Sequence, residues 1–158
     1  MGHVHFLPIG FGHQHYVRPL VQGDFEVTEV VILVPSENKQ WDPPIQNARA
    51  FLEGELGHQV MIREVPTAKF AEVVANGYVD IAATLRDGDH VYINTASPHA
   101  LGPGYALAAS YIVAESVQAD DAAAPVANLS RDQVQLYYTE PAGSHVGDVV
   151  DVAHQAAE

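Results

Sequence analysis

The sequence predicts an α/β fold of the Rossmann-like type, a parallel sheet doubly wound by helices on its two faces. Two observations lead to this prediction. Continuous apolar, β-branched runs such as residues 27–34 are typical of strands buried on both faces, and differ from the alternating pattern of a half-exposed strand. Segments with helical spacing of apolar residues separate these runs, and such alternation favours right-handed crossovers between parallel strands. The strand order expected from this pattern is about 3-2-1-4-5.

Five apolar segments are expected to form the strands of the sheet. They are residues 4–9, 27–34, 58–65, 90–94 and 134–139. The first is bounded by Gly10 and Gly12, which provide a tight exit from a buried strand. The second stops at Pro35, because proline cannot donate to a sheet ladder. In the last, Tyr137 and Tyr138 should point to opposite sides, so one ring is expected in the core and the other outside.

Two shorter helices are expected between the strands. The first runs from about residue 42 to residue 56, with Asp42 as N-cap before two prolines and Gly57 at its C-terminal end. Thr67 is a candidate cap for the second. Helical spacing there places an apolar face toward the sheet, made by Phe70, Val73 and Val74.

A long alanine-rich helix is expected from Pro103 to about Gln118. It is apolar nearly all round, so it should be largely buried, against the sheet on one side and a second subunit on the other. Residues beyond Pro141 are polar and contain glycine, which favours a short helix or a linker. The expected organisation is therefore one domain over residues 1–141 and a tail over residues 142–158.

Composition limits the class of protein. With 158 residues, 47% of them apolar, the chain can bury one continuous core. It contains no cysteine, which excludes disulfides, thiol nucleophiles and thiolate metal sites. No apolar run approaches the ~18 residues of a membrane span, and the N-terminal stretch lacks the pattern of a secretory signal. A cytoplasmic protein without membrane contact is expected.

The charge balance is strongly acidic. Twenty acidic residues face seven basic ones, which gives a formal net charge of −13. Such a charge repels itself at ordinary ionic strength, but at molar salt the screening length falls to ~3 Å, so the composition indicates a high-salt cytoplasm. Binding to nucleic acid is disfavoured because clustered Lys and Arg are missing, and any such contact would need a separate domain.

Two loops are expected to form a ligand site at the carboxyl ends of strands one and four, where the chain reverses its direction of travel across the sheet. Glycine allows close approach of backbone to ligand, and N–H groups at a helix start favour anions. These loops suit a phosphate-bearing or nucleotide ligand. Their candidate binding residues are Gly10, Phe11, Gly12 and His13 in the first loop, and Asn94, Thr95, Ala96, Ser97 and His99 in the second.

The nine histidines and Glu37 are candidates for other roles, in metal binding, catalysis or ribose recognition. Imidazole binds zinc, copper and nickel, but His3, His5, His13 and His15 lack a recognised ligand spacing, so no metal is predicted. His13 and His99 have pKa values near neutrality and are candidates for acid and base on a phosphodiester. Glu37 is either a ribose ligand, as in dinucleotide enzymes, or a solvated loop carboxylate.

Several segments together resemble a known family. They are FLPIGFG, VVILV, VYINTASPHALGPGYALAASYIVAE and LYYTEP, spread from about Val4 to Pro141. In these segments the chain resembles haloarchaeal transcriptional regulators whose N-terminal portion is a CRISPR-associated Rossmann-fold (CARF) domain. The resemblance implies a homodimer with a shared cleft for a cyclic oligonucleotide second messenger. It also implies a C-terminal winged helix-turn-helix, which the seventeen residues after Pro141 cannot contain.

The chain departs from the family pattern at the expected ligand site. Members usually carry arginine where His99 stands, and charged residues where Gly12 and Gln14 stand, so a weaker grip on phosphate is expected. The predicted function is a regulatory domain that senses a nucleotide-derived messenger, with cyclic oligoadenylate as the candidate, and without cofactor or assigned catalytic residue. The alternatives are a slow metal-independent phosphodiesterase (ring nuclease) acting on the same ligand, and a structural dimerisation module.

Overall fold

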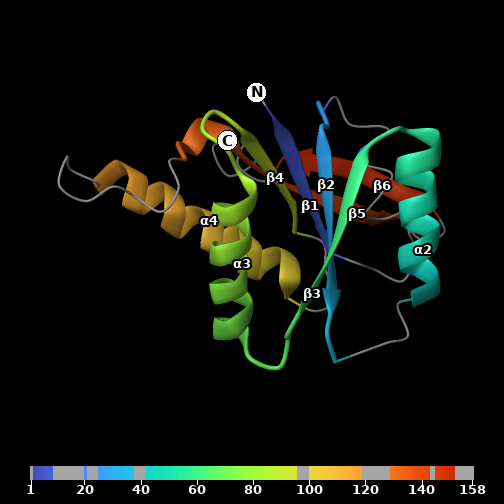
Figure 1. The fold of residues 1–158 in the computed structure, drawn as a ribbon, viewed down its shortest axis with the longest axis horizontal. Helices are drawn as coiled ribbons and strands as arrows, with labels where there is room; N and C mark the ends of the chain where they lie inside the picture. Colours follow the sequence, from blue (N-terminus) through green and yellow to red (C-terminus); the bar gives the residue numbers. More distant parts are fainter. Residues whose placement is uncertain are drawn as a thin grey trace.

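A computed structural model provides the coordinates, and the structure describes residues 2–8, 20, 25–37, 42–95, 100–118, 129–142 and 145–151. Its centre is a six-stranded sheet of order β3-β2-β1-β4-β5-β6. The first five strands in this order are mutually parallel, which confirms the predicted doubly wound fold and the order 3-2-1-4-5. Figure 1 shows β1 starting near the N-terminus and running downward, so the carboxyl edge of the sheet lies at the bottom.

The strands follow the apolar runs of the sequence closely. They are β1 (His3–Pro8), β2 (Glu29–Pro35), β3 (Gln59–Val65), β4 (His90–Asn94), β5 (Val134–Ala142) and β6 (His145–Asp151). Pro35 is the last residue of β2 and is buried, so the strand includes the proline instead of stopping before it. A 3₁₀ turn, η3 (Arg131–Gln133), leads into β5 through a reciprocal capping box of Ser130 and Gln133.

Strand β6 was not predicted. Residues 145–151, within the stretch expected to be a short helix or linker, pair antiparallel with β5 at the end of the sheet. Antiparallel pairing of consecutive strands needs only a short connection, and an edge strand does not require the continuous apolar run of a central one. Residues 134–139, expected to form the final strand, belong to β5, and β6 follows it in the chain.

Among the described elements, helices cover both faces of the sheet (Figure 1). Helices α3 (Phe70–Thr84) and α4 (Leu101–Gln118) enclose a core with β1, β2 and β4, in which Phe6, Ile93 and Tyr105 are fully buried. Helix α2 (Asp42–Ala50) continues into a π-helical turn, η2 (Phe51–Glu55), and packs on the other face over β2 and β3. Gly57 follows with a φ of +70°, as expected for a helix-ending glycine.

The start of α3 differs from the expectation. Thr67 does not cap the helix, because its N–H and its hydroxyl both donate to the carboxylate of Glu37, at 2.9 Å each. The N-cap position is Lys69, without a side-chain cap. Val73 is buried as predicted, but Phe70 is 48% exposed. Phe70 lies in the first helical turn, at the rim of the α3–α4 contact, where the sheet no longer covers it.

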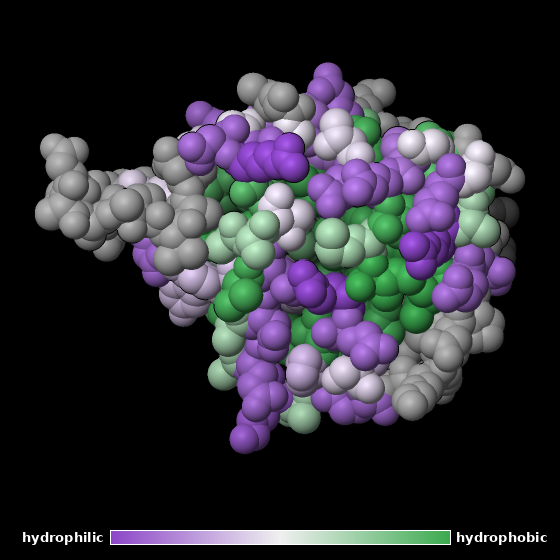
Figure 2. Space-filling model, in the orientation of Figure 1, coloured by the Kyte–Doolittle hydropathy of each residue, from purple (hydrophilic) through white to green (hydrophobic). Residues whose placement is uncertain are grey.

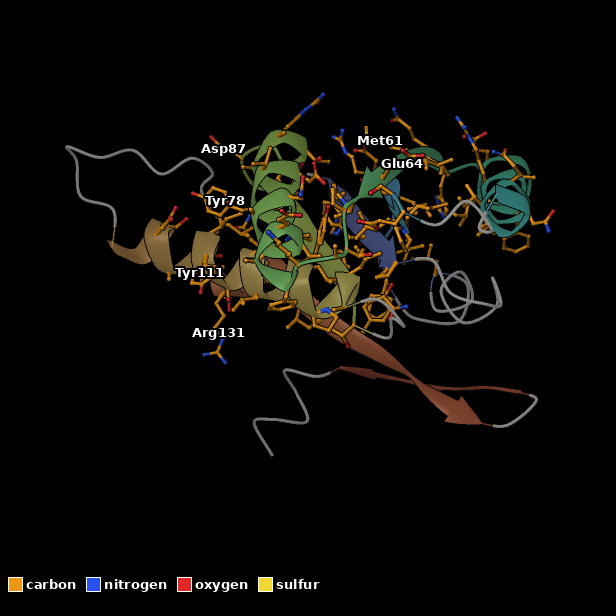
Figure 3. The ribbon with its side chains drawn as sticks, turned by 90° about the horizontal axis from the view of Figure 1, so that it is seen from below. Met61, Glu64, Tyr78, Asp87, Tyr111 and Arg131 are labelled. Carbon is orange, nitrogen blue, oxygen red and sulfur yellow. The ribbon has the colours of Figure 1, made fainter. Side chains whose placement is uncertain are left out.

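Helix α4 is buried on its sheet side but keeps an apolar outer side. Leu101, Tyr105, Ala108 and Ile112 are buried, whereas Leu107 is 38% and Tyr111 52% exposed. Figure 3 shows Tyr111 of α4 and Tyr78 of α3 on the outer side of the two helices, away from the sheet. Within the described ranges, no helix is long and apolar enough to cross a membrane.

Candidate functional site

The strand order places a topological switch point between β1 and β4. β1 pairs with β2 on one side and with β4 on the other, so the connections that leave their carboxyl ends diverge. In open α/β sheets ligands bind in the crevice at this position. Figure 3 views the molecule from this carboxyl edge.

Asn94 and Thr95 end β4 at this crevice. Asn94 is fully buried and lies opposite Tyr137 of β5 in the strand register. Thr95 donates twice to the carbonyl oxygen of Tyr137, from its N–H at 2.8 Å and from its hydroxyl at 3.0 Å. The exit from β4 is therefore fixed to β5 by two hydrogen bonds.

The first turn of α4 packs directly on the end of β4. A Cβ at Gly102 would lie 2.5 Å from the carbonyl oxygen of Asn94 and 2.8 Å from the Cα of Thr95, so only glycine fits there. Ala100, just before the helix, has a φ of +53°, and its carbonyl accepts the N–H of Gly104 at 2.9 Å. The first N–H groups of a helix lack intrahelical partners, and since Pro103 has no N–H and that of Gly104 bonds Ala100, this turn contributes the N–H groups of Leu101 and Gly102 beside the end of β4.

The structure describes two of the nine predicted binding residues. Asn94 and Thr95 lie at the carboxyl edge, as expected from their place after strand four. The other seven lie outside the described residues: Gly10, Phe11, Gly12, His13, Ala96, Ser97 and His99. The meeting of the two loops, and the acid–base roles of His13 and His99, therefore stay predictions.

The sequence predicts one of Tyr137 and Tyr138 in the core; the structure buries Tyr137, and its hydroxyl is the unexpected feature. The side chain is fully buried, and its Oη has no hydrogen-bond partner among the residues that the structure describes. Burial raises the pKa of the Tyr137 phenol, so the group stays protonated and remains a donor. An unpartnered buried hydroxyl costs stability, and its residue is paired with Asn94 in the strand register.

His5 carries a second unpartnered atom on the same face of the sheet. Its Nε2 lies 2.9 Å from the carbonyl oxygen of Glu26, which can only accept, so Nε2 carries the proton. Desolvation by burial lowers the pKa of His5 to about 4, and the ring is neutral at physiological pH. Its Nδ1 is therefore an unprotonated acceptor, buried and without a partner in the described part of the chain.

We predict a pH dependence of stability from His5. Its folded pKa, about 4, lies below the ordinary value of 6.5, so the unfolded chain binds more protons between these values. The free energy of unfolding should therefore fall as pH drops from about 6.5 to about 4, by up to ~3 kcal/mol. Urea denaturation of wild type and His5→Phe across this range isolates the contribution. Parallel pH profiles for the two proteins would contradict it.

Two other groups considered from the sequence have structural partners. Both carboxylate oxygens of Glu37 accept hydrogen bonds from Thr67, and these bonds lower the pKa of Glu37. In this structure Glu37 therefore holds the loop before α3 in place. His3 lies 2.6 Å from Glu26 through Nε2 and 2.9 Å from the Tyr92 hydroxyl through Nδ1. Among the described residues, no three His, Asp or Glu side chains are grouped to hold a metal ion.

A pocket of about 700 Å³ lies at the opposite, amino edge of the sheet. Gly2, Thr28 and Gln59 contribute from the starts of three strands, and Met61 and Arg63 from the α3 side of β3. Its charged groups have mixed signs, since Arg63 and Arg86 face Glu29, Asp87 and Asp89. Arg63 is also paired with Asp80 at 3.3 Å. This pocket is an alternative location for a ligand, but its mixed charges favour neither an anionic nor a cationic ligand.

The surface around this pocket is mostly polar. On the face shown in Figure 2, hydrophilic residues cover most of the area, and apolar residues reach the surface beside β3. Met61 of β3 is 38% exposed and belongs to this apolar fraction.

Comparison with known proteins gives no relative. No protein-family model matches the chain, and no curated protein matches it significantly.

Proposed function

We propose that this chain is a regulatory domain that senses a nucleotide-derived second messenger at the carboxyl edge of β1 and β4. The observation that carries the proposal is the place of two buried polar residues at this edge: Asn94 and Tyr137 are paired in the register of β4 and β5, and the first turn of α4 packs on the backbone of Asn94. Three features thus meet: a switch point, helix N–H groups, and a buried hydroxyl without a partner.

A phosphate-bearing ligand fits this edge better than the rest of the molecule. The net charge of −13 repels anions in general, so binding must depend on local donors that are not offset by nearby carboxylates. The described part of the edge holds the Asn94 side chain, and the first turn of α4 contributes the N–H groups of Leu101 and Gly102. The family resemblance adds cyclic oligoadenylate as the candidate messenger.

The proposal includes a homodimer that works in the cytoplasm at high salt and controls transcription through a separate DNA-binding partner. The exposed apolar side chains of α4, Leu107 and Tyr111, support the dimer, because charged residues would otherwise be expected on the outer side of a helix in so acidic a chain. The setting in CRISPR-associated signalling depends on the resemblance alone.

Ligand-induced stabilisation in multimolar KCl tests the function. Cyclic tetra-adenylate or AMP at about 100 times its Kd should stabilise the wild type by about 2.7 kcal/mol, or roughly 5–10 °C in Tm. Asn94→Ala should lose most of this shift, measured against its own ligand-free Tm. Asn76→Ala is the matched control, because Asn76 lies on α3, where its side-chain amide donates to the carbonyl oxygen of Glu72. No shift in wild type, or equal shifts in all three proteins, would refute the proposal.

A further inference from the structure

Four aromatic rings gather on the α2 side of the sheet, next to the proposed site. His5 stacks on Tyr92 with ring centroids 4.2 Å apart and planes 4° from parallel. Phe25, which precedes β2, lies 5.6 Å from the Tyr92 ring, 5.9 Å from His5 and 5.1 Å from Tyr137. Phe25 is only partly buried, so it covers the other three rings from the outside.

The segment that carries Phe25 is tied to β1 at its edge. Glu26, largely exposed, pairs with His3 at 2.6 Å, and its carbonyl accepts from His5. Thr28 donates its N–H to the carbonyl of His3 at 2.9 Å and accepts the N–H of His3 on its hydroxyl at 2.7 Å. Residues 25–28 thus form a strap across the aromatic rings, held by polar bonds, with Phe25 as its apolar contact.

The covered rings present one donor and one acceptor with no partner. Tyr137 Oη is the donor and His5 Nδ1 the acceptor, and both side chains are fully buried. Each unpartnered atom lowers stability, and folding gains nothing from either of them. A molecule that accepts from one and donates to the other would recover both hydrogen bonds.

We propose that Tyr137 and His5 form a subsite for a planar, uncharged heteroaromatic ring of the nucleobase class, which displaces the Phe25 ring and stacks in its place. Aromatic side chains bind flat rings face to face, and a nucleobase carries acceptor and donor atoms on one edge. A charged ring is disfavoured because its burial would cost too much free energy. The inference rests on the proposed function and deepens it, since it names the group that is recognised.

Tyr137 links the subsite to the strand ends at the carboxyl edge. Tyr137 lies opposite Asn94 in the register of β5 and β4, and its carbonyl holds Thr95. A nucleotide can therefore place its base on the His5 and Tyr137 side while its phosphate lies at the first turn of α4. The strap must open for this, and its exposed Glu26–His3 pair is the bond that would break first.

Tyr137→Phe tests the subsite because it removes only the unpartnered hydroxyl. The variant should keep or raise the ligand-free Tm, and it should bind AMP at least 10-fold more weakly than wild type in calorimetric titration. Tyr105→Phe is the matched control, since Tyr105 is equally buried but its hydroxyl bonds Asp80 on the other face. This control should lower Tm and leave the affinity for AMP within about twofold.

A second probe separates the failure of this inference from that of the proposed function. Ribose 5-phosphate has the phosphate without the base, so its affinity should fall in Asn94→Ala but not in Tyr137→Phe. If AMP and ribose 5-phosphate bind and Tyr137→Phe weakens neither, the subsite is wrong while the function stands. A lower ligand-free Tm in Tyr137→Phe would also overturn the subsite. If wild type binds neither probe, both proposals fail.

Discussion

Gly102→Ala is expected to lower the free energy of unfolding by about 3 kcal/mol, because the added methyl group meets backbone on two sides. It would lie 2.5 Å from the carbonyl oxygen of Asn94 and 2.8 Å from the Cα of Thr95. Neither atom can rotate away as a side chain could, so α4 must move off the end of β4. Urea denaturation at constant high salt measures the loss.

Gly54→Ala is the control for this substitution. A Cβ at Gly54 meets nothing within 4 Å, and the residue lies in a helical turn where alanine is preferred. We expect this variant to be unchanged or more stable by about 0.5–1 kcal/mol. Equal midpoints for the two variants would show that the close packing of α4 on β4 does not contribute to stability.

Tyr105→Phe should destabilise the fold by about 1.5–3 kcal/mol, whereas Tyr78→Phe should change it by no more than about 0.5 kcal/mol. Both tyrosines donate to a carboxylate at 2.5 Å, Tyr105 to Asp80 and Tyr78 to Glu115. The first pair is buried between α3, α4 and β3, where Arg63 also reaches Asp80. Removing the phenol leaves a buried carboxylate with one partner fewer.

The second pair lies at the surface, where water replaces the lost hydrogen bond. The difference between the two variants, measured by the same denaturation experiment, therefore reports the burial of the α3–α4 contact. Equal losses in the two variants would contradict the burial that the structure assigns to Asp80. A loss in Tyr78→Phe as large as that expected for Tyr105→Phe would do the same.

The central strands were predictable because their signal is local. Residues 30–34 and 91–93 are continuous apolar runs, and a strand buried on both faces requires such a run. The strand order followed from the alternation with helices and the handedness of crossovers. Strand β6 could not be found in this way, because its place depends on backbone pairing with β5 rather than on its own apolar content.

The start of α3 depends on contacts with distant segments, and these contacts cannot be predicted from the sequence near the helix. Thr67 has the residue type of a cap, but Glu37, thirty positions earlier, takes its hydroxyl and its N–H. Phe70 has the right spacing for burial, but it stands where α3 leaves the cover of the sheet. In both cases a distant segment decides the outcome.

The candidate site was predictable only in part. Asn94 and Thr95 were found because residues at the carboxyl end of a central strand share one edge. Tyr137 and His5 were seen as a core ring and a strand-face histidine. Whether their Oη and Nδ1 atoms find partners depends on how three strands and the strap pack together. The spacing of residues in the sequence does not predict this packing.

Amide hydrogen exchange with and without cyclic tetra-adenylate, in multimolar KCl, tests the location of the ligand site most directly. We predict slower exchange at Thr95, Leu101, Gly102 and Gly104, where β4 ends and α4 begins. The amino-edge pocket, including Met61, Arg63 and Arg86, should be unchanged. Protection confined to that pocket, or no protection at a saturating concentration, would contradict the proposed site.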